Sequence, residues 1–476
     1  MASGRMVFRR ELRSSGGEFA CGAGVDPPTA GQPSVTVLSP TVIMALDRWR
    51  SNDRARLCAT VCKHIRPFAS VCDRYSVPEI RVGAVDDRTE ATHPTREWTV
   101  ILDNLSDANE PRHANEPKPR SNTSAYPVSS YTEWDPLEEV IVGIVDGAAF
   151  PTWHMSLPPV LPTDQHDTFR SRAGQPFPAE QVEAARRELE QFVHILEAEG
   201  VTVRRPEPIP QQQTYSTLDW ASTGMYAAMP RDALLVVGDE IIECPMAWRS
   251  RYFETLAYRP LLKEYFRAGA RWSSAPKPEL KDEQFDQSWT DPGDEGPTRL
   301  VVTEFEPTFD AADFTRCGRD IIAQTSNVTN TFGIEWLRRH LGDEYRIHVF
   351  EFKDSHPMHI DATLVPMAPG KLLIHPDRVP EVPKLFKGWD VMAAPQPVIP
   401  DGHPLYMTSK WLNMNILMLD EERVIVERQD EPMIDAMRRF GFTPIPCDFR
   451  NFNSFGGSFH CATLDVRRRG TLESYL

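Results

Sequence analysis

The chain has 476 residues, of which 41% are hydrophobic, and it carries a formal net charge of −16. This length accommodates two or three ordinary domains or one large closed domain, and the hydrophobic content is sufficient for a globular core. Nucleic-acid binding needs clustered Lys and Arg that neutralise phosphates, so the acidic balance argues against it. No apolar run reaches the roughly 18 residues that span a bilayer, and we therefore expect no membrane span.

Eight cysteines are spread along the chain without the paired spacing of a small disulfide framework, so reduced thiols are expected. Cys58, Cys62, His64 and Cys72 form a loose group. Their spacing matches no standard zinc pattern, and the segment resembles an ordinary helix. We therefore predict no metal and no organic cofactor.

The first quarter of the chain has the composition of an extension. Residues 14–40 are rich in Gly, Pro, Ser and Thr, and residues 85–127 are polar with repeated Asn-Glu-Pro. These patterns predict an N-terminal extension over 1–125, partly disordered with some helix, and a globular body over 126–476. Four arginines within residues 1–13 leave a mitochondrial transit peptide as the alternative to a cytoplasmic location.

The body contains five similar units in which an amphipathic stretch runs into a glycine and then a short β-rich run. The helical stretches and their glycines are 179–199 with Gly200, 252–267 with Gly269, 334–341 with Gly342, 384–387 with Gly388 and 432–440 with Gly441. Four of the helices follow a hairpin-like pair of strands, which are 233–237 with 240–242, 309–314 with 321–322, 359–366 with 372–374 and 415–419 with 424–426.

The fifth pair needs both ends of the body. Residues 139–143 and 459–466 are the strands left over, and their pairing would close a ring as in a propeller. The predicted fold is therefore α/β, with five ββαβ units around a pseudo-fivefold axis. An open α/β sheet is the alternative, which the repeated hairpins and the absence of a phosphate-type glycine loop disfavour.

Several chemically distinctive residues occupy similar places in successive units, so a closed ring would bring them to one central pocket. They are Asp232, Asp310, His359, Asp361, Thr408, Ser409 and Cys461.

Cys461 follows a glycine pair and is predicted to lie on the closing strand, and the two-residue spacing of His359 and Asp361 would place both on one strand face. His460 would then point away from the thiol, which makes His359 the better base. A cysteine beside an imidazole indicates covalent transfer, and several carboxylates suit a planar guanidinium cation such as that of arginine.

Six segments of the sequence carry a resemblance to a known family. They are 127–143 (PVSSYTEWDPLEEVIVG), 229–232 (MPRD), 245–251 (PMAWRSR), 309–313 (FDAAD), 358–361 (MHID) and 456–461 (GGSFHC). These segments closely resemble glycine amidinotransferase, and the resemblance covers residues 126–476. It implies the pentein fold, a five-bladed α/β propeller.

The resemblance also implies roles for the site residues. Cys461, His359 and Asp310 would form a catalytic triad, and Asp232 and Asp361 would hold the guanidinium. Arg378 would bind the substrate carboxylate with Thr408 and Ser409, where the family carries serine at the position of Thr408. The implied activity moves the amidino group of arginine to glycine through an amidino-cysteine, giving ornithine and guanidinoacetate as in the first step of creatine-type biosynthesis. A homodimer is implied as well.

Three other readings remain open. An amidinotransferase with another amine acceptor, such as an inosamine phosphate, would share most of these motifs. An arginine deiminase-like hydrolase would share the Cys, His and Asp set. A non-catalytic propeller that binds partners would retain its function without the Cys461 thiol.

Overall fold

The computed structural model describes residues 5–8, 82–84, 98–101, 126–407 and 410–476. The chain divides into two compact units, Met1–Ser121 and Asn122–Leu476. The first unit contains an antiparallel sheet in the order β1-β3-β2, with strands β1 (Arg5–Phe8), β2 (Val82–Ala84) and β3 (Trp98–Ile101). The predicted disorder and helix of the extension, and the group formed by Cys58, Cys62, His64 and Cys72, lie outside the described residues.

The second unit contains five separate three-stranded sheets, in the orders β20-β4-β5, β8-β9-β10, β11-β12-β13, β14-β15-β16 and β17-β18-β19. The strands of the first two sheets are β20 (Thr463–Arg468), β4 (Leu137–Val142), β5 (Thr202–Arg204), β8 (Leu234–Val237), β9 (Glu240–Glu243) and β10 (Arg271–Ser274). Those of the other three are β11 (Phe314–Cys317), β12 (Asp320–Gln324), β13 (Arg346–Phe350), β14 (Leu364–Ala368), β15 (Lys371–Ile374), β16 (Asp390–Ala393), β17 (Leu417–Met418), β18 (Arg423–Glu427) and β19 (Thr443–Cys447). Two short strands, β6 (Tyr215–Ser216) and β7 (Ala221–Ser222), form a separate ribbon.

Each of the five sheets repeats one pairing pattern. In each sheet the middle strand pairs antiparallel with one neighbour and parallel with the other. The antiparallel pair is a hairpin in four of the sheets, and in the fifth it joins β20 to β4 from opposite ends of the body. The hairpin turn after β8 is tight because Gly238 adopts a φ of 59°, and Gly318 does the same after β11 with a φ of 71°. The sequence predicted four of these hairpins, and the structure confirms that they form. The first strands predicted at 309–314 and 359–366 are misplaced, because β11 begins at Phe314 and β14 at Leu364.

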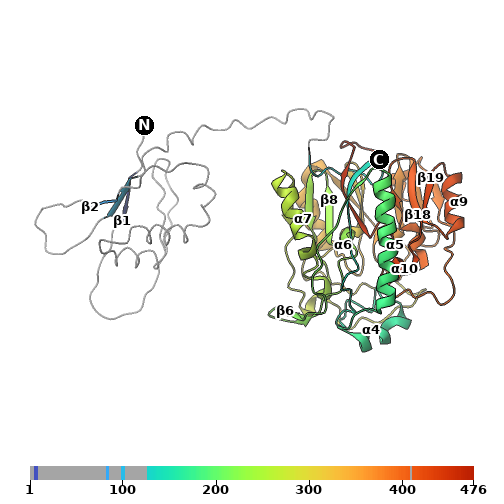
Figure 1. Ribbon diagram of the computed structural model, residues 1–476, viewed down its shortest axis with the longest axis horizontal. Helices are drawn as coiled ribbons and strands as arrows, with labels where there is room; N and C mark the ends of the chain where they lie inside the picture. The colour runs from blue at the N-terminus through green and yellow to red at the C-terminus, as the bar shows by residue number, and fades with distance from the viewer. Residues whose placement is uncertain (1–4, 9–81, 85–97, 102–125, 408–409) are drawn as a thin grey trace, which may run out of the picture. The chain divides into compact units, whose positions relative to one another are not determined.

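Helices connect the hairpin to the parallel strand in four of the five units. These are α5 (Ala179–Ala198), α7 (Thr255–Arg267), α8 (Thr331–Leu341) and α9 (Glu431–Arg439). The fifth connection, before β16, is only a 3-10 turn, η8 (Lys384–Phe386), so the helix predicted over 384–387 is shorter than an α-helix. In Figure 1, α7 and α9 lie on opposite flanks of the second unit, with strands between them.

The remaining helices are short. They are α4 (His166–Arg172), α6 (Pro230–Ala233), α10 (Arg450–Asn453) and the 3-10 turns η2 (Thr163–Gln165), η3 (Arg249–Arg251), η4 (Asp282–Gln284), η5 (Ala311–Asp313), η6 (Gly342–Glu344), η7 (Ile360–Ala362) and η9 (Lys410–Met414). Within the described part of the chain, none of the helices combines the length and apolar character that a membrane crossing requires.

Helix α5 illustrates how the sequence builds the core. Its buried residues Ala185, Leu189, Phe192, Val193 and Leu196 form one stripe, because residues three or four apart share a helix face. The ring of Phe192 lies within 5.3 Å of two aromatic rings from the C-terminal part of the chain. The helix therefore packs against the segment that lies between β19 and β20.

The two ends of the body pair as predicted. Strand β20 runs antiparallel to β4, with Thr463 opposite Val142 and Leu464 opposite Ile141. The five sheets remain distinct from one another, and no closed sheet forms among the described residues.

A buried ionic cluster lies beneath these strands, centred on Asp465 of β20. We define the ionic cluster as Asp465, Arg231, Arg316, Arg468 and Glu133, all of them buried. Asp465 Oδ2 accepts hydrogen bonds from Arg316 Nη2 and Arg468 Nε, each at 2.6 Å, and Asp465 Oδ1 pairs with Arg231. Burial raises the pKa of Asp465, but the three guanidinium groups outweigh it and hold that pKa well below its ordinary value.

We expect Asp465→Asn to destabilise the protein strongly, because it leaves three buried guanidinium groups without their shared counter-charge. Breaking a buried ion pair in this way costs about 3–5 kcal/mol. The free energy of unfolding in urea measures the effect. Asp435→Asn is the matched control, since Asp435 pairs with Arg438 at an exposed helix surface. Equal stability losses for the two variants would contradict the role of the cluster.

Candidate active site

The predicted site residues come from equivalent places in the fold, just before the first strand of each hairpin. Asp232 lies in α6 before β8, Asp310 directly precedes η5 and β11, and His359 and Asp361 lie at η7 before β14. Cys461 lies in the turn before β20, where Ala462 N donates to Ser458 O. Four separate units thus present side chains at corresponding positions.

Cys461 is held by its backbone in a crowded turn. Its N–H donates to Asn415 Oδ1 at 3.0 Å, and the same oxygen accepts from Ser458 N at 3.0 Å. A Cβ placed on Gly457 would lie 2.5 Å from Cys461 Cβ and 2.7 Å from Met229 Sδ. The glycine is therefore needed for space beside the cysteine. The prediction that Cys461 lies on a strand is wrong, since β20 begins two residues later.

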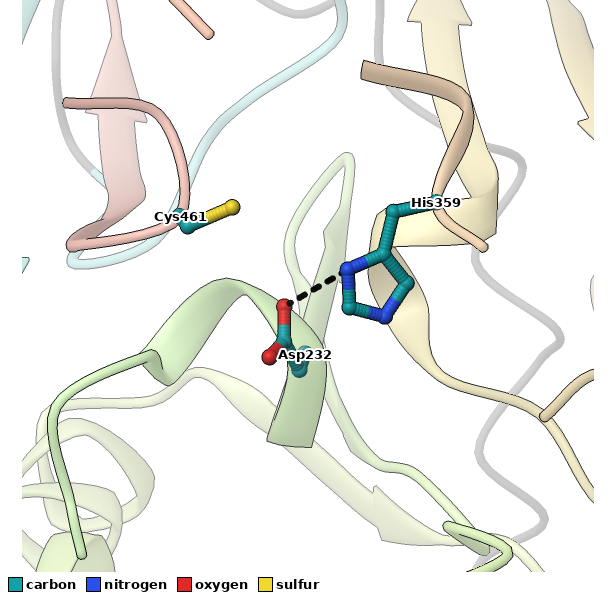
Figure 2. Close-up of side chains that lie close together, drawn as sticks. All are labelled: Asp232, His359 and Cys461. Carbon is teal, nitrogen blue, oxygen red and sulfur yellow. Dashed lines mark ion pairs between the residues drawn. The ribbon is translucent and has the colours of Figure 1, made fainter. Parts of the chain in front are cut away.

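His359 adopts a φ of 58°, in the left-handed region that non-glycine residues seldom occupy. Its Nε2 lies 3.1 Å from Asp310 Oδ2 and its Nδ1 lies 3.7 Å from Asp232 Oδ1. Figure 2 shows Cys461, His359 and Asp232 directed toward a shared space from three separate segments of the chain. Ligand atoms of these three residues all lie within 4.8 Å of one another.

The carboxylates of Asp310 and Asp232 are each anchored through one oxygen. Asp310 Oδ2 also accepts from Trp248 Nε1 at 3.1 Å, and Asp232 Oδ2 accepts from Arg251 Nη1 at 2.8 Å. The other oxygen of each carboxylate, Oδ1, is buried without a hydrogen-bond partner. Such buried acceptors are costly unless a donor arrives, and the N–H groups of a cationic ligand would supply one.

Asp361 lies on the other side of the thiol. Its Oδ2 accepts from the Cys461 thiol at 3.5 Å and lies 2.7 Å from His460 Nδ1. The expectation that His460 points away from the site is wrong, because the chain turns at this place and does not alternate as a strand. The expectation that His359 and Asp361 share a strand face is also wrong, because residues Ile360–Ala362 form the 3-10 turn η7.

The electrostatics of the pair favour an imidazolium beside a neutral thiol. Burial lowers the pKa of His359, but Asp232, Asp310 and the thiol outweigh it and hold this pKa well above its ordinary value. Burial and the charge of Asp361 raise the pKa of Cys461 to about 12, against the opposing effect of His359. Burial likewise raises the pKa of Asp310.

The remaining predicted residues divide into two groups. Arg378 Nε pairs with Asp354 Oδ2 at 2.9 Å, and its Nη1 donates to Thr363 Oγ1 at 3.3 Å, two residues beyond Asp361. Binding of a substrate carboxylate by Arg378 stays a prediction. Thr408 and Ser409 lie outside the described residues.

Sequence reasoning missed four residues that support the site. Trp248 and Arg251 hold Asp310 and Asp232, Asn415 holds the Cys461 turn, and His460 contacts Asp361. Trp248, Arg251 and His460 lie within segments 245–251 and 456–461, which carried the family resemblance, but the sequence assigned them no supporting role.

The set of one thiol, one imidazole and one carboxylate is also one that zinc accepts. The sequence predicts no metal for this site. An assay of the site should therefore compare activity with and without a metal chelator.

Comparison with characterised proteins identifies the chain's relatives. No family model matches the chain. An L-arginine:L-lysine amidinotransferase from Pseudomonas savastanoi pv. phaseolicola is 70% identical over 350 residues, covering 74% of this chain and 97% of the relative. A mitochondrial glycine amidinotransferase from Danio rerio is 51% identical over 373 residues, covering 77% of this chain and 88% of the relative. The chain belongs to the amidinotransferase family.

Solved structures of other amidinotransferases resemble this amidinotransferase in fold. An amidinotransferase of the saxitoxin biosynthetic pathway from Microseira wollei has a TM-score of 0.71 at 54% identity, covering 74% of this chain and all of that one. The inosamine-phosphate amidinotransferase of Streptomyces griseus has a TM-score of 0.67 at 38% identity, covering 73% and 99%. Family membership confirms the resemblance found in the sequence and supports the pentein fold.

We expect Gly457→Ala to reduce amidino transfer at least about tenfold while leaving the protein folded, because the added methyl group displaces Cys461. Steady-state kcat/KM and a thermal unfolding curve measure the two effects. Gly402→Ala is the control, since a Cβ there meets no atom within 4 Å, although its φ of 75° makes that variant slightly strained. Full activity in Gly457→Ala would contradict the tight packing.

We also expect Cys461 of the free enzyme to react slowly with iodoacetamide at neutral pH. Only the thiolate reacts, and a pKa raised to about 12 keeps the group protonated well beyond the ordinary cysteine range. The alkylation rate at residue 461, followed by peptide mass mapping, should keep rising past pH 9. A plateau below pH 8 would show a depressed pKa instead.

Proposed function

We propose that this amidinotransferase takes the amidino group of L-arginine and passes it to an amine through a covalent amidino-cysteine on Cys461. The observation that carries the proposal is the buried meeting of the thiol, His359 and Asp232, with one carboxylate oxygen on each of Asp232 and Asp310 that accepts no hydrogen bond. Carboxylates of this kind suit the N–H groups of a guanidinium, and a thiol suits attack on its carbon.

In the first half-reaction, a guanidinium bound beside Cys461 favours the thiolate, because the positive charge offsets the neighbouring carboxylates. The thiol proton passes to solvent as arginine binds, and the thiolate regains a proton when the guanidino product leaves. The thiolate attacks the guanidinium carbon. His359 then donates its proton to the departing nitrogen, the carbon–nitrogen bond breaks, and ornithine leaves. The amidino group remains on sulfur as an isothiouronium cation, and Asp310 stabilises the orientation of the imidazole.

In the second half-reaction, the acceptor enters as a neutral amine and attacks the same carbon while His359 takes one of its N–H protons. The carbon–sulfur bond breaks, which regenerates the thiolate and the imidazolium. The acceptor ammonium loses a proton to water as it enters the site, and the ornithine amine gains a proton from water after it leaves. These two transfers balance. Water must be kept out while the amidino group is on the sulfur, because attack by water would hydrolyse the adduct instead of transferring the group.

Lysine is the acceptor that we propose first, because the arginine:lysine enzyme of Pseudomonas savastanoi shares 70% of its residues with this chain. Glycine, the acceptor expected from the sequence motifs, is the second candidate, because enzymes that carry its name share 51–52%. The proposed triad would serve either acceptor, so the choice between them depends on the shape of the acceptor pocket.

We further infer that the five sheets stand as blades around the site in a five-bladed propeller. The equivalent positions of Asp232, Asp310, His359 and Cys461 in four different units support this arrangement. A homodimer and a cytoplasmic location, with the mitochondrion as the alternative, stay predictions.

The test uses arginine labelled in its guanidino carbon, with lysine, glycine, an inosamine phosphate or no acceptor. We expect ping-pong kinetics, ornithine release from arginine alone in one equivalent per site, and the label on Cys461 by peptide mapping. With acceptors present, kcat/KM for lysine should exceed that for glycine by at least about tenfold.

Cys461→Ser should abolish both label transfer and adduct, and a chelator should leave the rate unchanged. Labelled citrulline without acceptor would favour a hydrolase. Ornithine release that requires both substrates would contradict the covalent route.

A further inference from the structure

His460, next to the nucleophile in sequence, is buried between two carboxylates. Its Nδ1 lies 2.7 Å from Asp361 Oδ2 and its Nε2 lies 3.3 Å from Glu133 Oε2. His460, Asp361 and Glu133 expose no more than 7% of their surface. Nothing in the mechanism above uses this histidine, yet one of its partners also contacts the Cys461 thiol.

The contacts form a continuous path from the ionic cluster to the sulfur. Arg316 holds Glu133 through two bonds, Nε to Oε1 at 2.9 Å and Nη2 to Oε2 at 2.7 Å. Glu133 in turn lies against His460, His460 against Asp361, and Asp361 Oδ2 against the thiol at 3.5 Å. Because Arg316 holds both carboxylate oxygens of Glu133, the His460 imidazole has a fixed acceptor on the side of Nε2.

We propose that His460 is a positioning residue for amidino transfer, which holds the Asp361 carboxylate beside the thiol so that it meets the guanidinium of arginine. This inference rests on the proposed function, together with the guanidinium-binding role that the family resemblance implies for Asp361. His460 does not touch the reacting atoms itself; it acts through Asp361.

Charge supports the geometry. Burial raises the pKa of Asp361, but the hydrogen bond and charge of His460 outweigh it and lower that pKa below its ordinary value. Burial and Arg231 lower the pKa of His460, whereas Asp361 and Glu133 raise it above its ordinary value. The His460 imidazolium thus keeps the Asp361 carboxylate ionised, which is the form that binds a cation.

The backbone at His460 has its own supports, so the ring can be changed without moving the cysteine. The His460 carbonyl accepts from Thr463 Oγ1 at 3.0 Å and from Arg231 Nε at 3.4 Å. Asn415 Oδ1 holds the N–H of Cys461 from another segment. Substitution of the imidazole therefore tests the side chain rather than the turn.

Three substitutions at this residue separate its two hydrogen bonds. His460→Asn keeps an N–H donor near the place of Nδ1, toward Asp361. His460→Gln keeps one near the place of Nε2, toward Glu133, and His460→Ala keeps neither. His340→Ala is the control, because His340 Nε2 also pairs with a buried carboxylate, Glu240, at 3.0 Å but in another part of the fold.

The measurements are kcat and KM for labelled arginine, with thermal unfolding of each variant. We expect His460→Ala and His460→Gln to lower kcat/KM about 10- to 100-fold, chiefly through KM for arginine, as loss of a charge-assisted hydrogen bond predicts. His460→Asn should recover most of that loss, and KM for the acceptor should change little. His340→Ala should match the wild type in both constants.

Equal impairment of the Asn and Gln variants, or wild-type kinetics in all three, would overturn the inference. If His460→Ala does not fold, the comparison of the other two variants decides the test. The kcat/KM of His460→Asn for arginine must then exceed that of His460→Gln by about tenfold. Failure of the proposed function is separate from this result, because it would appear in the wild type as absence of transfer from arginine.

Discussion

A single buried carboxylate organises the body of this amidinotransferase. Asp465 has no exposed surface and pairs with Arg231, Arg316 and Arg468. These arginines also reach other sheets, since Arg316 Nη1 donates to Val236 O in β8 and Arg468 Nη2 donates to Met418 O in β17. Through Glu133 and His460 the same network reaches Asp361, so one set of charges contacts all five repeated units. Buried charges of this kind are stable only when they are paired, so few other arrangements of the units would satisfy them. The cluster therefore helps to fix how the units are placed against one another.

This constraint explains why the active site is both precise and composite. The thiol, the imidazole and the carboxylates stand on segments that share no secondary structure, and each segment lies directly before a strand that the core holds in place. The left-handed backbone of His359 and the crowded turn at Gly457 each lead into a largely buried strand, β14 or β20, whose packing holds the turn in place. The chemistry therefore depends on how the five units meet rather than on any local motif.

The sequence predicted what local patterns encode. Helix ends were recognisable because glycines follow them in the left-handed conformation, as at Gly200 and Gly441, and strands β8 and β9 stood out through a tight glycine turn between apolar runs. The starts of β11, β14 and β20 were placed too early, because the polar residues before them alternate with apolar ones and so imitate a strand. Only tertiary contacts reveal that these stretches are turns. The partners of the site, among them Asn415 and His460, were likewise invisible, because their contacts join residues 46 and 99 positions apart.

The pairing of β20 with β4 has a consequence for how the enzyme becomes active during translation. Strand β20 follows every other described strand in the sequence, and it brings both the central carboxylate and, just ahead of it, the thiol proposed as the nucleophile. A ribosome-bound chain that lacks this strand holds neither the charge that neutralises the buried arginines nor that thiol. On the proposed mechanism, folding competence and catalytic competence are therefore delivered by the same late segment.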